Sequence, residues 1–297
     1  MNINDILTVC LITYNHDQYV EQAIDSILMQ KTNFNWKLVI ADDCSKDNTR
    51  EILKHYQQKY PEKIHLILQE KNVGPARNFI ELITYPKSKY IAYLEGDDYW
   101  LDENKLQKQV DFLEENNDYV IHSASARLIK NGVLTDETIG FEKESKSFEI
   151  SDFFRNNNLV SCTIMYRNVL KEFPDFYKEL VFGDWFLYIL LMHKTGGKSF
   201  RLNEIFSAYR IHNSSAMASL TDETFVSKHF ALVIAIKKYL KLQSNNKEIV
   251  NSMNFYALQL FNFAVKKSKF KAFKIFLVNF QHCKFKTPFK QYLVFLK

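Results

Sequence analysis

Four clusters of polar side chains in the first hundred residues each follow a short apolar run. The clusters are Thr13-Tyr14-Asn15, Asp42 to Asp47, Asn72 to Asn78, and Glu95 to Asp98. Carboxylates dominate the second and fourth clusters, and gathering so many of them is costly unless a cation is bound nearby. Mg²⁺ and Mn²⁺ prefer oxygen ligands, and Mg²⁺ usually shares its coordination between one or two carboxylates and phosphate oxygens. These residue types therefore predict a divalent cation bound together with a diphosphate.

Two further side chains in these clusters suit a nucleotide. Arg77 offers a fixed positive charge and a planar fork for a phosphate or a base carbonyl. Tyr14 offers a flat aromatic face for a nucleobase. We therefore expect the ligand to be a nucleoside diphosphate.

The apolar runs before the clusters have the pattern of strands that are buried on both faces. We expect these strands at 6–13, 36–41, 63–68 and 90–94, with helices at 17–30, at 47–60 and from Pro75, where Asp17 and Asp47 serve as helix caps. Alternating strands and helices predict a mainly parallel, Rossmann-like sheet with helices on both faces. Because ligands of such sheets bind beyond the carboxyl ends of the strands, the four clusters should meet at one rim.

The second half of the chain has a different pattern. We expect a helix at 104–115, a strand at 119–129 that ends in the hairpin signal Asn131-Gly132, a helix at 184–194, and mainly helices from residue 221. The expected organisation is a catalytic domain over 1–220 followed by a helical region over 221–297. Within the catalytic domain, 1–100 is the nucleotide-binding half and 101–220 is the acceptor and catalytic half.

Composition narrows the class of protein. The chain has 297 residues, 46% of them hydrophobic, and its 7 glycines and 5 prolines argue against long linkers. The four cysteines are far apart and form no C-x-x-C pair, so neither a disulfide framework nor a thiolate zinc site is indicated. Neither a leader sequence nor a run long enough to span a membrane is apparent. We therefore expect a cytoplasmic protein.

The C-terminal region is basic and aromatic. Beyond Glu248 there is no acidic residue, whereas nine lysines alternate with phenylalanines up to Lys297. One interpretation is that 249–297 lies as an amphipathic segment on an anionic membrane surface, on the inner face of the cell membrane. The other is a helical subdomain with its phenylalanines inside and its lysines solvated. The sequence leaves both open.

The clusters, taken in order, resemble glycosyltransferase family 2, whose members are inverting enzymes with the GT-A fold. The resemblance rests on LITYN, ADDCSKDNT, NVGPARN and EGDDYW in the first hundred residues, and it continues to residue 212 through GDW (183–185) and YRIH (209–212). It implies a nucleotide-sugar donor, with a UDP-sugar favoured, and a Mn²⁺ or Mg²⁺ cofactor. It also implies a glycan or glycolipid acceptor in cell-surface polysaccharide biosynthesis.

The same resemblance implies a role for individual residues. Those expected to bind the nucleoside or the donor are Thr13, Tyr14, Asn15, Asp42, Asp43, Arg77 and Asp97, with Asp97 facing the ribose. Asp98 is expected to ligate the metal, and His212 to ligate the metal or a phosphate. Asp184 is expected to be the base that takes the proton of the acceptor hydroxyl, although it also suits the N-cap of a helix.

The acidic cluster has two further details. The cluster reads E-G-D-D and departs from a spaced D-x-D, so Glu95 is expected outside the coordination of the metal, as a structural acceptor. Tyr99 and Trp100 are expected to pack and fix the acidic loop.

Other functions fit less well. A nucleotidyltransferase or a nucleotide-sugar hydrolase would use a similar metal-diphosphate site, but the former is expected to carry a glycine- and lysine-rich phosphate loop that LITYNHD lacks. A non-catalytic nucleotide-binding protein, associated with a membrane or with nucleic acid, is the second alternative. No RNP-like, helix-turn-helix or zinc-finger pattern is present, so we expect no nucleic-acid partner.

Overall fold

The computed structural model describes residues 5–180, 183–212, 221–283 and 292. The chain divides into two compact units. The first unit comprises 1–149, 158–179 and 190–212, and the second comprises 150–157, 180–189 and 213–297. Two short segments before residue 190 thus group with the C-terminal helices, while the expected domain boundary at residue 220 stays a prediction.

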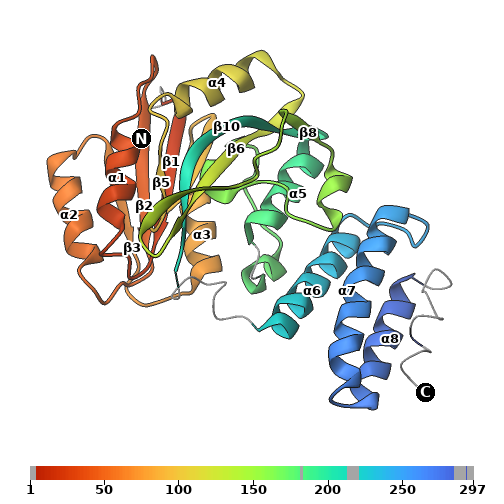
Figure 1. The fold of residues 1–297 in the computed structure, drawn as a ribbon. Helices are drawn as coiled ribbons and strands as arrows, with labels where there is room; N and C mark the ends of the chain where they lie inside the picture. Colours follow the sequence, from red (N-terminus) through yellow and green to blue (C-terminus); the bar gives the residue numbers. More distant parts are fainter. Residues whose placement is uncertain (1–4, 181–182, 213–220, 284–291, 293–297) are drawn as a thin grey trace. The chain divides into compact units, whose positions relative to one another are not determined.

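The first unit is built on a mixed sheet (Figure 1). In the described part of the chain its strands are β1 (Leu7–Thr13), β2 (Trp36–Asp42), β3 (Ile64–Leu68), β4 (Tyr90–Glu95), β5 (Tyr99–Trp100), β6 (Tyr119–Lys130), β7 (Val133–Ile139), β8 (Lys146–Phe148), β9 (Met165–Arg167) and β10 (Lys198–Ile211). Their order is β3-β2-β1-β4-β9-β6-β10-β5, with β7 beside β6 and β8 beside β10. The longest ladders are parallel, namely β1 with β2 and β4, β2 with β3, and β6 with β10. The carboxyl ends of β1 to β4 therefore lie at one edge.

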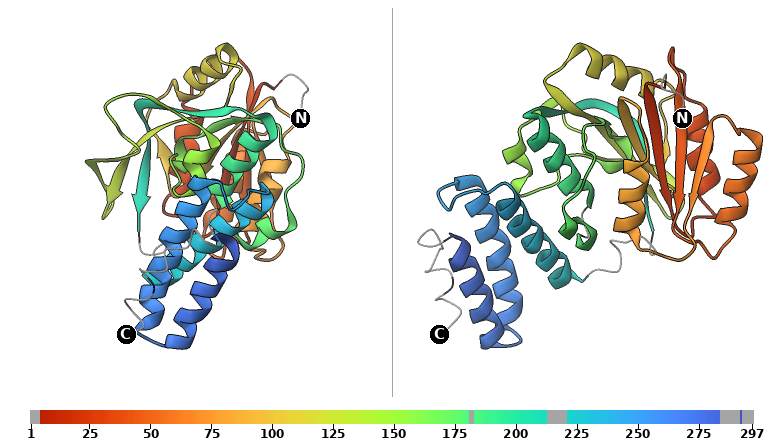
Figure 2. Two further views of the ribbon diagram at one scale, coloured as in Figure 1. Left: turned by 90° about the vertical axis from the view of Figure 1, so that its right-hand side faces the viewer. Right: turned by 180° about the vertical axis from the view of Figure 1, so that it is seen from behind.

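Helices cover both faces of this sheet (Figure 2). They are α1 (Val20–Leu28), α2 (Thr49–Lys59), α3 (Pro75–Thr84) and α4 (Lys105–Glu115). Val9 and alternate residues of β1 pack into one hydrophobic core with α1, α2 and α4. On the opposite face, the Cys10 thiol donates to the Leu82 carbonyl of α3 at 3.7 Å. The alternation of strand and helix in the sequence therefore predicted the layers correctly.

Three local features differ from or sharpen the expectations. Asp17 and Asp47 do not occupy the N-cap positions, which are Tyr19 and Asn48. The Asp47 carboxylate nevertheless accepts the N–H of Thr49, the first residue of α2, at 3.0 Å, and it also accepts the N–H of Asp17 at 3.1 Å and so joins the two loops. The hairpin between β6 and β7 is confirmed, with positive φ at its two turn residues. Strand β10 was not predicted, because charged residues interrupt its alternation and its long ladder with β6 decides its conformation.

The second unit is helical, as expected for the C-terminal region. It contains the first turns of α5 (Gly183–Thr195), followed by α6 (Asp222–Tyr239), α7 (Lys247–Val265) and α8 (Lys269–Cys283). Helix α7 packs against both α6 and α8 (Figure 1). Phe261 is fully buried between α7 and α8, and the Asn246 side chain caps α7 by accepting the N–H of Ile249 at 3.0 Å. In the described residues, no helix combines the length and the apolar character that crossing a membrane requires.

Short 3-10 segments complete the chain. They are η1 (Ile150–Phe154), η2 (Ser161–Thr163) and η3 (Asp175–Glu179). Segment η2 packs beside β4, and its Cys162 carbonyl accepts hydrogen bonds at 2.9 Å from the Trp100 indole and from the Ser207 hydroxyl. Segment η2 therefore holds Trp100, in the strand that directly follows the acidic loop.

Candidate active site

The loops that follow β1 and β2 are tied together at the rim. The Asn15 N–H donates to Ser45 Oγ at 2.8 Å, and the Lys46 N–H donates to Asn15 Oδ1 at 2.8 Å. The His16 N–H donates to Thr49 Oγ1 at 2.9 Å. Asn15 has a φ of +53°, a left-handed conformation that asparagine tolerates better than most residues. The first two polar clusters of the sequence are therefore joined, and Asn15 acts as the link between them.

Asp42 is buried within this rim and holds its loop closed. Its carboxylate accepts the Ser45 N–H at 3.1 Å and the Ser45 hydroxyl, and it pairs with Arg50 Nε at 2.5 Å. Both carboxylate oxygens are thus engaged by the chain itself. Asp42 therefore organises the loop in this structure.

Asp43 connects the second cluster to the third. Its two oxygens accept the N–H groups of Val73 at 2.7 Å and of Gly74 at 3.0 Å, where α3 begins. Burial raises the pKa of the Asp43 carboxyl, and these two N–H donors act in the opposite direction. The carboxylate lies at the meeting point of β2 and the loop before α3.

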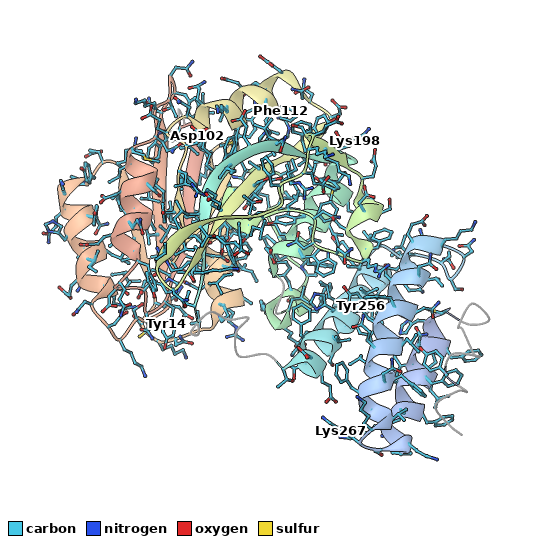
Figure 3. The ribbon with its side chains drawn as sticks, viewed as in Figure 1. Tyr14, Asp102, Phe112, Lys198, Tyr256 and Lys267 are labelled. Atoms are coloured by element: carbon cyan, nitrogen blue, oxygen red, sulfur yellow. The ribbon has the colours of Figure 1, made fainter. Side chains whose placement is uncertain are left out.

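Three predicted donor-binding side chains differ from Asp42 and Asp43 in making, within the described part of the chain, no hydrogen bond that holds a loop. Thr13 is buried, and its hydroxyl has no hydrogen-bond partner in the described residues. Tyr14 is 37% exposed at the end of β1 (Figure 3). Arg77 is exposed on the first turn of α3, and its side chain makes no hydrogen bond or ion pair with the described residues. Tyr14 and Arg77 are therefore accessible to a ligand at the rim, whereas the Thr13 hydroxyl is enclosed by the protein.

The acidic loop after β4 brings Asp97 against a residue from the end of β10. His212 Nε2 lies 2.9 Å from Asp97 Oδ2, and His16 Nε2 lies 3.8 Å from the same oxygen. Burial lowers the pKa of His16, while the neighbouring Asp97 charge works against that shift. One carboxylate and two imidazoles thus meet at the edge of the sheet.

Asp98 has a different environment from Asp97. It is 2% exposed, and its Oδ1 accepts the backbone N–H of Arg210 at 2.7 Å. Burial is the main cause that raises the pKa of Asp98 well above its usual value, and the charges of Asp97 and Glu95 add to it. Glu95 itself accepts the Ser161 hydroxyl at 3.1 Å. Of the three acids in the loop, Asp97 is therefore the one that faces His212.

The acidic loop is held by close packing on both sides. A Cβ atom built on Gly96 would lie 2.8 Å from Thr13 Oγ1 and 3.0 Å from His16 Nδ1, so this approach requires glycine. Trp100 is 1% exposed, and its backbone N–H donates to Ser26 Oγ at 3.0 Å. The position of the Asp97 carboxylate is thereby fixed.

The donor set at Asp97 fits a divalent cation that completes its coordination elsewhere. Carboxylate oxygens suit Mg²⁺ and Mn²⁺, whereas imidazole is a ligand of transition metals, so the pair of Asp97 and His212 fits Mn²⁺ better than Mg²⁺. Throughout the described ranges, no three His, Cys, Asp or Glu side chains gather to hold a metal on their own. Asp97 and His212 are therefore the residues that could hold a cation, with a diphosphate and water supplying the remaining ligands.

Asp184 lies in the second unit, on the first turn of α5. Its Oδ2 accepts a hydrogen bond from Asn157 Nδ2 at 2.9 Å, and the next residue, Trp185, is buried with its indole N–H donating to the Phe153 carbonyl at 2.7 Å. Burial raises the pKa of Asp184, whereas the N–H of Trp185 and the Asn157 side chain lower it in part. The environment thus moves this carboxyl toward the pKa of a general base.

Comparison with known proteins identifies the family. A model described as glycosyl transferase family 2 matches residues 8–172, which is more than half of the chain. The chain belongs to glycosyl transferase family 2. The match covers the loops that carry Asp43 and Asp97, and it ends before α5 and β10.

Individual relatives and solved structures are similar over longer ranges. An uncharacterized protein of Mycobacterium tuberculosis is 29% identical over 69% of the chain, and that alignment spans 59% of the mycobacterial protein. The putative teichuronic acid biosynthesis glycosyltransferase TuaG of Bacillus subtilis is 28% identical over 72% of the chain and 82% of its own length. The crystal structure of S. aureus TarS 1–349 with UDP-GlcNAc covers 96% of the chain and 82% of that protein, with 17% identity and a TM-score of 0.67. The GT-A fold expected from the sequence is therefore confirmed.

Within each unit, the structure shows partners of the predicted site residues that the sequence did not single out. His16 approaches Asp97, Asn157 holds Asp184, and Arg210 and Tyr19 lie beside the acidic loop. His16 directly follows the T-Y-N motif and Arg210 belongs to Y-R-I-H, so a motif marked both positions without assigning a role. Tyr19 and Asn157 carry no sequence signal, because only the fold brings them to their partners.

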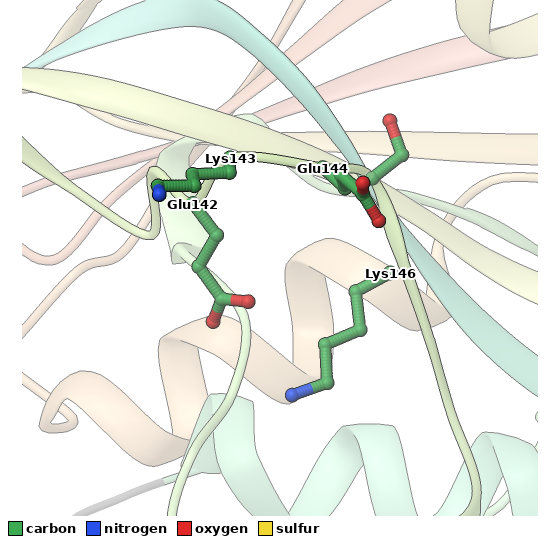
Figure 4. Close-up of a pocket in the computed structure, with 5 residues that line it drawn as sticks. Glu142, Lys143, Glu144 and Lys146 are labelled. Carbon is green, nitrogen blue, oxygen red and sulfur yellow. The ribbon is translucent and has the colours of Figure 1, made fainter.

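A pocket elsewhere on the first unit is separate from these family 2 residues. It is lined by Glu142 to Lys146, five consecutive residues that connect β7 to β8 and include the first residue of β8 (Figure 4). The Glu142 carboxylate is paired with Arg201 of β10. No predicted site residue lines this pocket, so we assign it no part in catalysis.

Proposed function

We propose that the protein is an inverting glycosyltransferase that transfers a sugar from a nucleotide-diphosphate sugar to a hydroxyl group of a glycan or glycolipid. The contact between Asp97 and His212, at a rim built from four loops, carries this proposal. A UDP-sugar is the favoured donor, since TarS was solved with UDP-GlcNAc. The name of TuaG, which refers to teichuronic acid biosynthesis, supports a role in cell-surface polysaccharide synthesis.

The rim provides a surface for the nucleoside. Tyr14 offers its exposed ring to the base, and Arg77 offers a cationic fork at the first turn of α3. Asp43 and Asn15 keep the loops in register. We assign Asp42 to loop stability, because its oxygens are already engaged.

The geometry favours Asp97 over Asp98 as the metal ligand. Asp97 is 17% exposed at its side chain and contacts His212, whereas Asp98 is buried and accepts a backbone N–H. We therefore assign the metal to Asp97, although the motif resemblance implied Asp98 as the metal ligand and Asp97 as the ribose contact. A divalent cation at Asp97 and His212 would neutralise the charge that builds on the diphosphate as the sugar bond breaks.

Asp184 is the proposed general base. Its carboxylate takes the proton of the acceptor hydroxyl while that oxygen attacks the anomeric carbon on the side opposite the leaving diphosphate. One displacement of this kind inverts the anomeric configuration. Since burial raises the pKa of Asp184, the carboxylate is a stronger base than an exposed aspartate.

A thermal-shift experiment tests the metal assignment. The melting temperature of the wild type is measured with Mn²⁺ and UDP, each alone and together, and is expected to rise most with both because both bind the folded state. Asp97→Ala should abolish the increment due to Mn²⁺. Asp98→Asn, the matched control, should retain it. Loss in Asp98→Asn with retention in Asp97→Ala would restore the roles implied by the motifs.

A donor panel tests the reaction. Released nucleotide is measured for a set of UDP-, GDP- and dTDP-sugars, with and without membrane glycolipid extract as acceptor. A transferase should release nucleotide faster with acceptor and should move the labelled sugar into it. Nucleotide release that is equal in both conditions, without labelled product, would instead indicate a nucleotide-sugar hydrolase.

We also propose that the C-terminal helices attach the enzyme to an anionic membrane surface, where a lipid-linked acceptor would be found. Phe270 of α8 is 65% exposed, and Phe273 and Leu277 are exposed on the same side of the helix. Lys274 Nζ lies 4.6 Å from the centre of the Phe270 ring. An aromatic face bordered by lysines, in a region without acidic residues beyond Glu248, is typical of an interfacial helix.

Vesicle flotation tests this attachment. The wild type should float with vesicles that contain phosphatidylglycerol and should stay at the bottom with purely zwitterionic vesicles. The double variant Phe270→Ser/Phe273→Ser should lose flotation, because the aromatic area is removed. The control Phe141→Ser changes an exposed phenylalanine of the first unit and should float like the wild type. Wild-type protein that stays at the bottom with anionic vesicles would refute the attachment and leave the transferase proposal intact.

A further inference from the structure

Tyr19, at the start of α1, lies between two side chains from the end of β10. The Arg210 guanidinium carbon lies 4.4 Å from the centre of the Tyr19 ring. The His212 ring is 5.5 Å from the same ring, at an interplanar angle of 44°. The aromatic ring therefore touches both polar residues of the Y-R-I-H segment and limits how far the imidazole can turn.

Arg210 also forms hydrogen bonds with the acidic loop. Its backbone N–H donates to Asp98 Oδ1 at 2.7 Å, and its Nε donates to the Asp97 carbonyl at 2.8 Å. Its Nη2 donates to Gln22 Oε1 of α1 at 2.9 Å. One residue thus joins the acidic loop, the end of β10 and the start of α1, three segments that are far apart in the sequence.

The chemistry of arginine suits this task in a way that lysine cannot reproduce. A planar guanidinium directs Nε and Nη2 to two fixed acceptors and stacks on an aromatic face at the same time, whereas an ammonium group is a point charge on a flexible chain. Groups that orient the ligands of a metal commonly change its affinity by about 10- to 100-fold when they are removed. Arg210 contacts the Asp97 backbone and Tyr19 contacts the His212 ring, so each residue is placed to orient one of the two proposed metal ligands.

We propose that Arg210 and Tyr19 are positioning residues that hold His212 against Asp97 and thereby set the affinity for the divalent cation. Arg210 fixes the backbone that presents the Asp97 carboxylate, and Tyr19 restrains the imidazole of His212. The two ligands are then in place before the cation arrives, so binding does not have to order them. This inference rests on the proposed metal site at Asp97 and His212.

Mn²⁺ binding, measured by electron paramagnetic resonance in the presence of UDP, tests the inference without reference to turnover. Arg210→Lys and Tyr19→Leu should each raise the Kd for Mn²⁺ by about tenfold or more. Tyr19→Phe keeps the ring and should bind Mn²⁺ like the wild type. The affinity for UDP without Mn²⁺ should be the same in all of these variants.

Arg167→Lys provides a matched control. Arg167 donates from Nε to the Tyr119 carbonyl at 2.9 Å, and its guanidinium lies 5.6 Å from the Tyr90 ring, at the end of β4 opposite the acidic loop. This variant removes the same kind of contacts, so it should lower the melting temperature and leave the Kd for Mn²⁺ unchanged.

Three outcomes would overturn the inference. Wild-type Mn²⁺ affinity in both Arg210→Lys and Tyr19→Leu shows that the two residues are structural only. An equal loss of affinity in Arg167→Lys shows that general destabilisation is the cause. Wild-type protein that binds no Mn²⁺ with UDP overturns the proposed metal site together with this inference, and it is distinguished from the first two outcomes by the wild-type titration itself.

Discussion

Carboxylates at the rim of the first unit accept hydrogen bonds from backbone N–H groups of neighbouring loops, whereas helices α6 to α8 of the second unit pack mainly through apolar side chains. Asp43 is held by Val73 and Gly74, and Asp98 by Arg210. Phe261, in contrast, is buried among apolar groups of α7 and α8. The first arrangement fixes the direction of a charge, and the second supplies stability mainly through buried apolar area.

Asp184 is an exception to this contrast, because it belongs to the second unit and is nevertheless held by a polar side chain. Asn157 donates to its carboxylate as the backbone donates to the rim carboxylates. If the contrast is sound, substitutions in the rim and at Asp184 should affect catalysis, and substitutions in the helical core should affect stability alone.

The largest effect on catalysis is expected for Asp184→Asn. A general base contributes about 10²- to 10⁴-fold to the rate, so kcat should fall by a factor in this range. Asparagine can still accept the Asn157 hydrogen bond, and therefore the melting temperature and the UDP affinity should hardly change. Steady-state transfer with a labelled donor measures the loss. Transfer at the wild-type rate would remove Asp184 from the mechanism.

A large effect on stability is expected for Phe261→Ala. Truncation of a fully buried phenylalanine costs about 3–5 kcal/mol of unfolding free energy, because apolar contacts are lost and a cavity remains. Urea denaturation measures this cost. The affinity of the folded protein for UDP, measured by calorimetry below the transition, should equal that of the wild type. A weaker UDP affinity would show that the helical core also shapes the rim.

An intermediate effect is expected for Gly96→Ala. The added Cβ would meet Thr13 Oγ1 and His16 Nδ1 at distances that require a displacement. Overpacking of this kind costs about 1–3 kcal/mol, and here the acidic loop should shift. We expect a lower melting temperature together with weaker Mn²⁺ binding. A variant with unchanged stability and unchanged Mn²⁺ affinity would show that the loop has room to adjust.

The smallest effect is expected for Asn157→Ala, and it concerns pH. The amide donor stabilises the charged form of Asp184 and so lowers its pKa, against the effect of burial. Its removal should raise the pKa of Asp184 and move the acid limb of kcat/KM to higher pH by up to about one unit, since one unit corresponds to about 1.4 kcal/mol. Asn156→Ala, an exposed neighbour, is the control and should leave the limb in place. If the acid limb of kcat/KM does not move in Asn157→Ala, Asn157 has only a structural role.

The sequence predicted the fold and the rim because their determinants are local. Each of β1 to β4 is a short apolar run, and each polar cluster follows its strand within a few residues, so periodicity and strand order were enough to bring Thr13, Asp43 and Asp97 to one edge. The hairpin after β6 was predicted for the same reason. An Asn-Gly pair specifies its turn through two positive φ angles.

The remaining features depend on contacts over long distances in the chain. Strand β10 lacks a clear alternation, and its place is set by the ladder with β6. The choice between Asp97 and Asp98 depends on His212 and Arg210, which lie more than a hundred residues later. Two adjacent aspartates look alike in a sequence, and only the burial of Asp98 and the orientation of Asp97 separate them.

The position of β10 in the chain has a consequence for biosynthesis. Asp97 leaves the ribosome long before His212, and the strand that carries His212 must first align with β6. A nascent chain that already displays its nucleotide-binding loops therefore still lacks the second half of the proposed cation site. The order of synthesis thus delays competence for sugar transfer until the last strand of the sheet has been added.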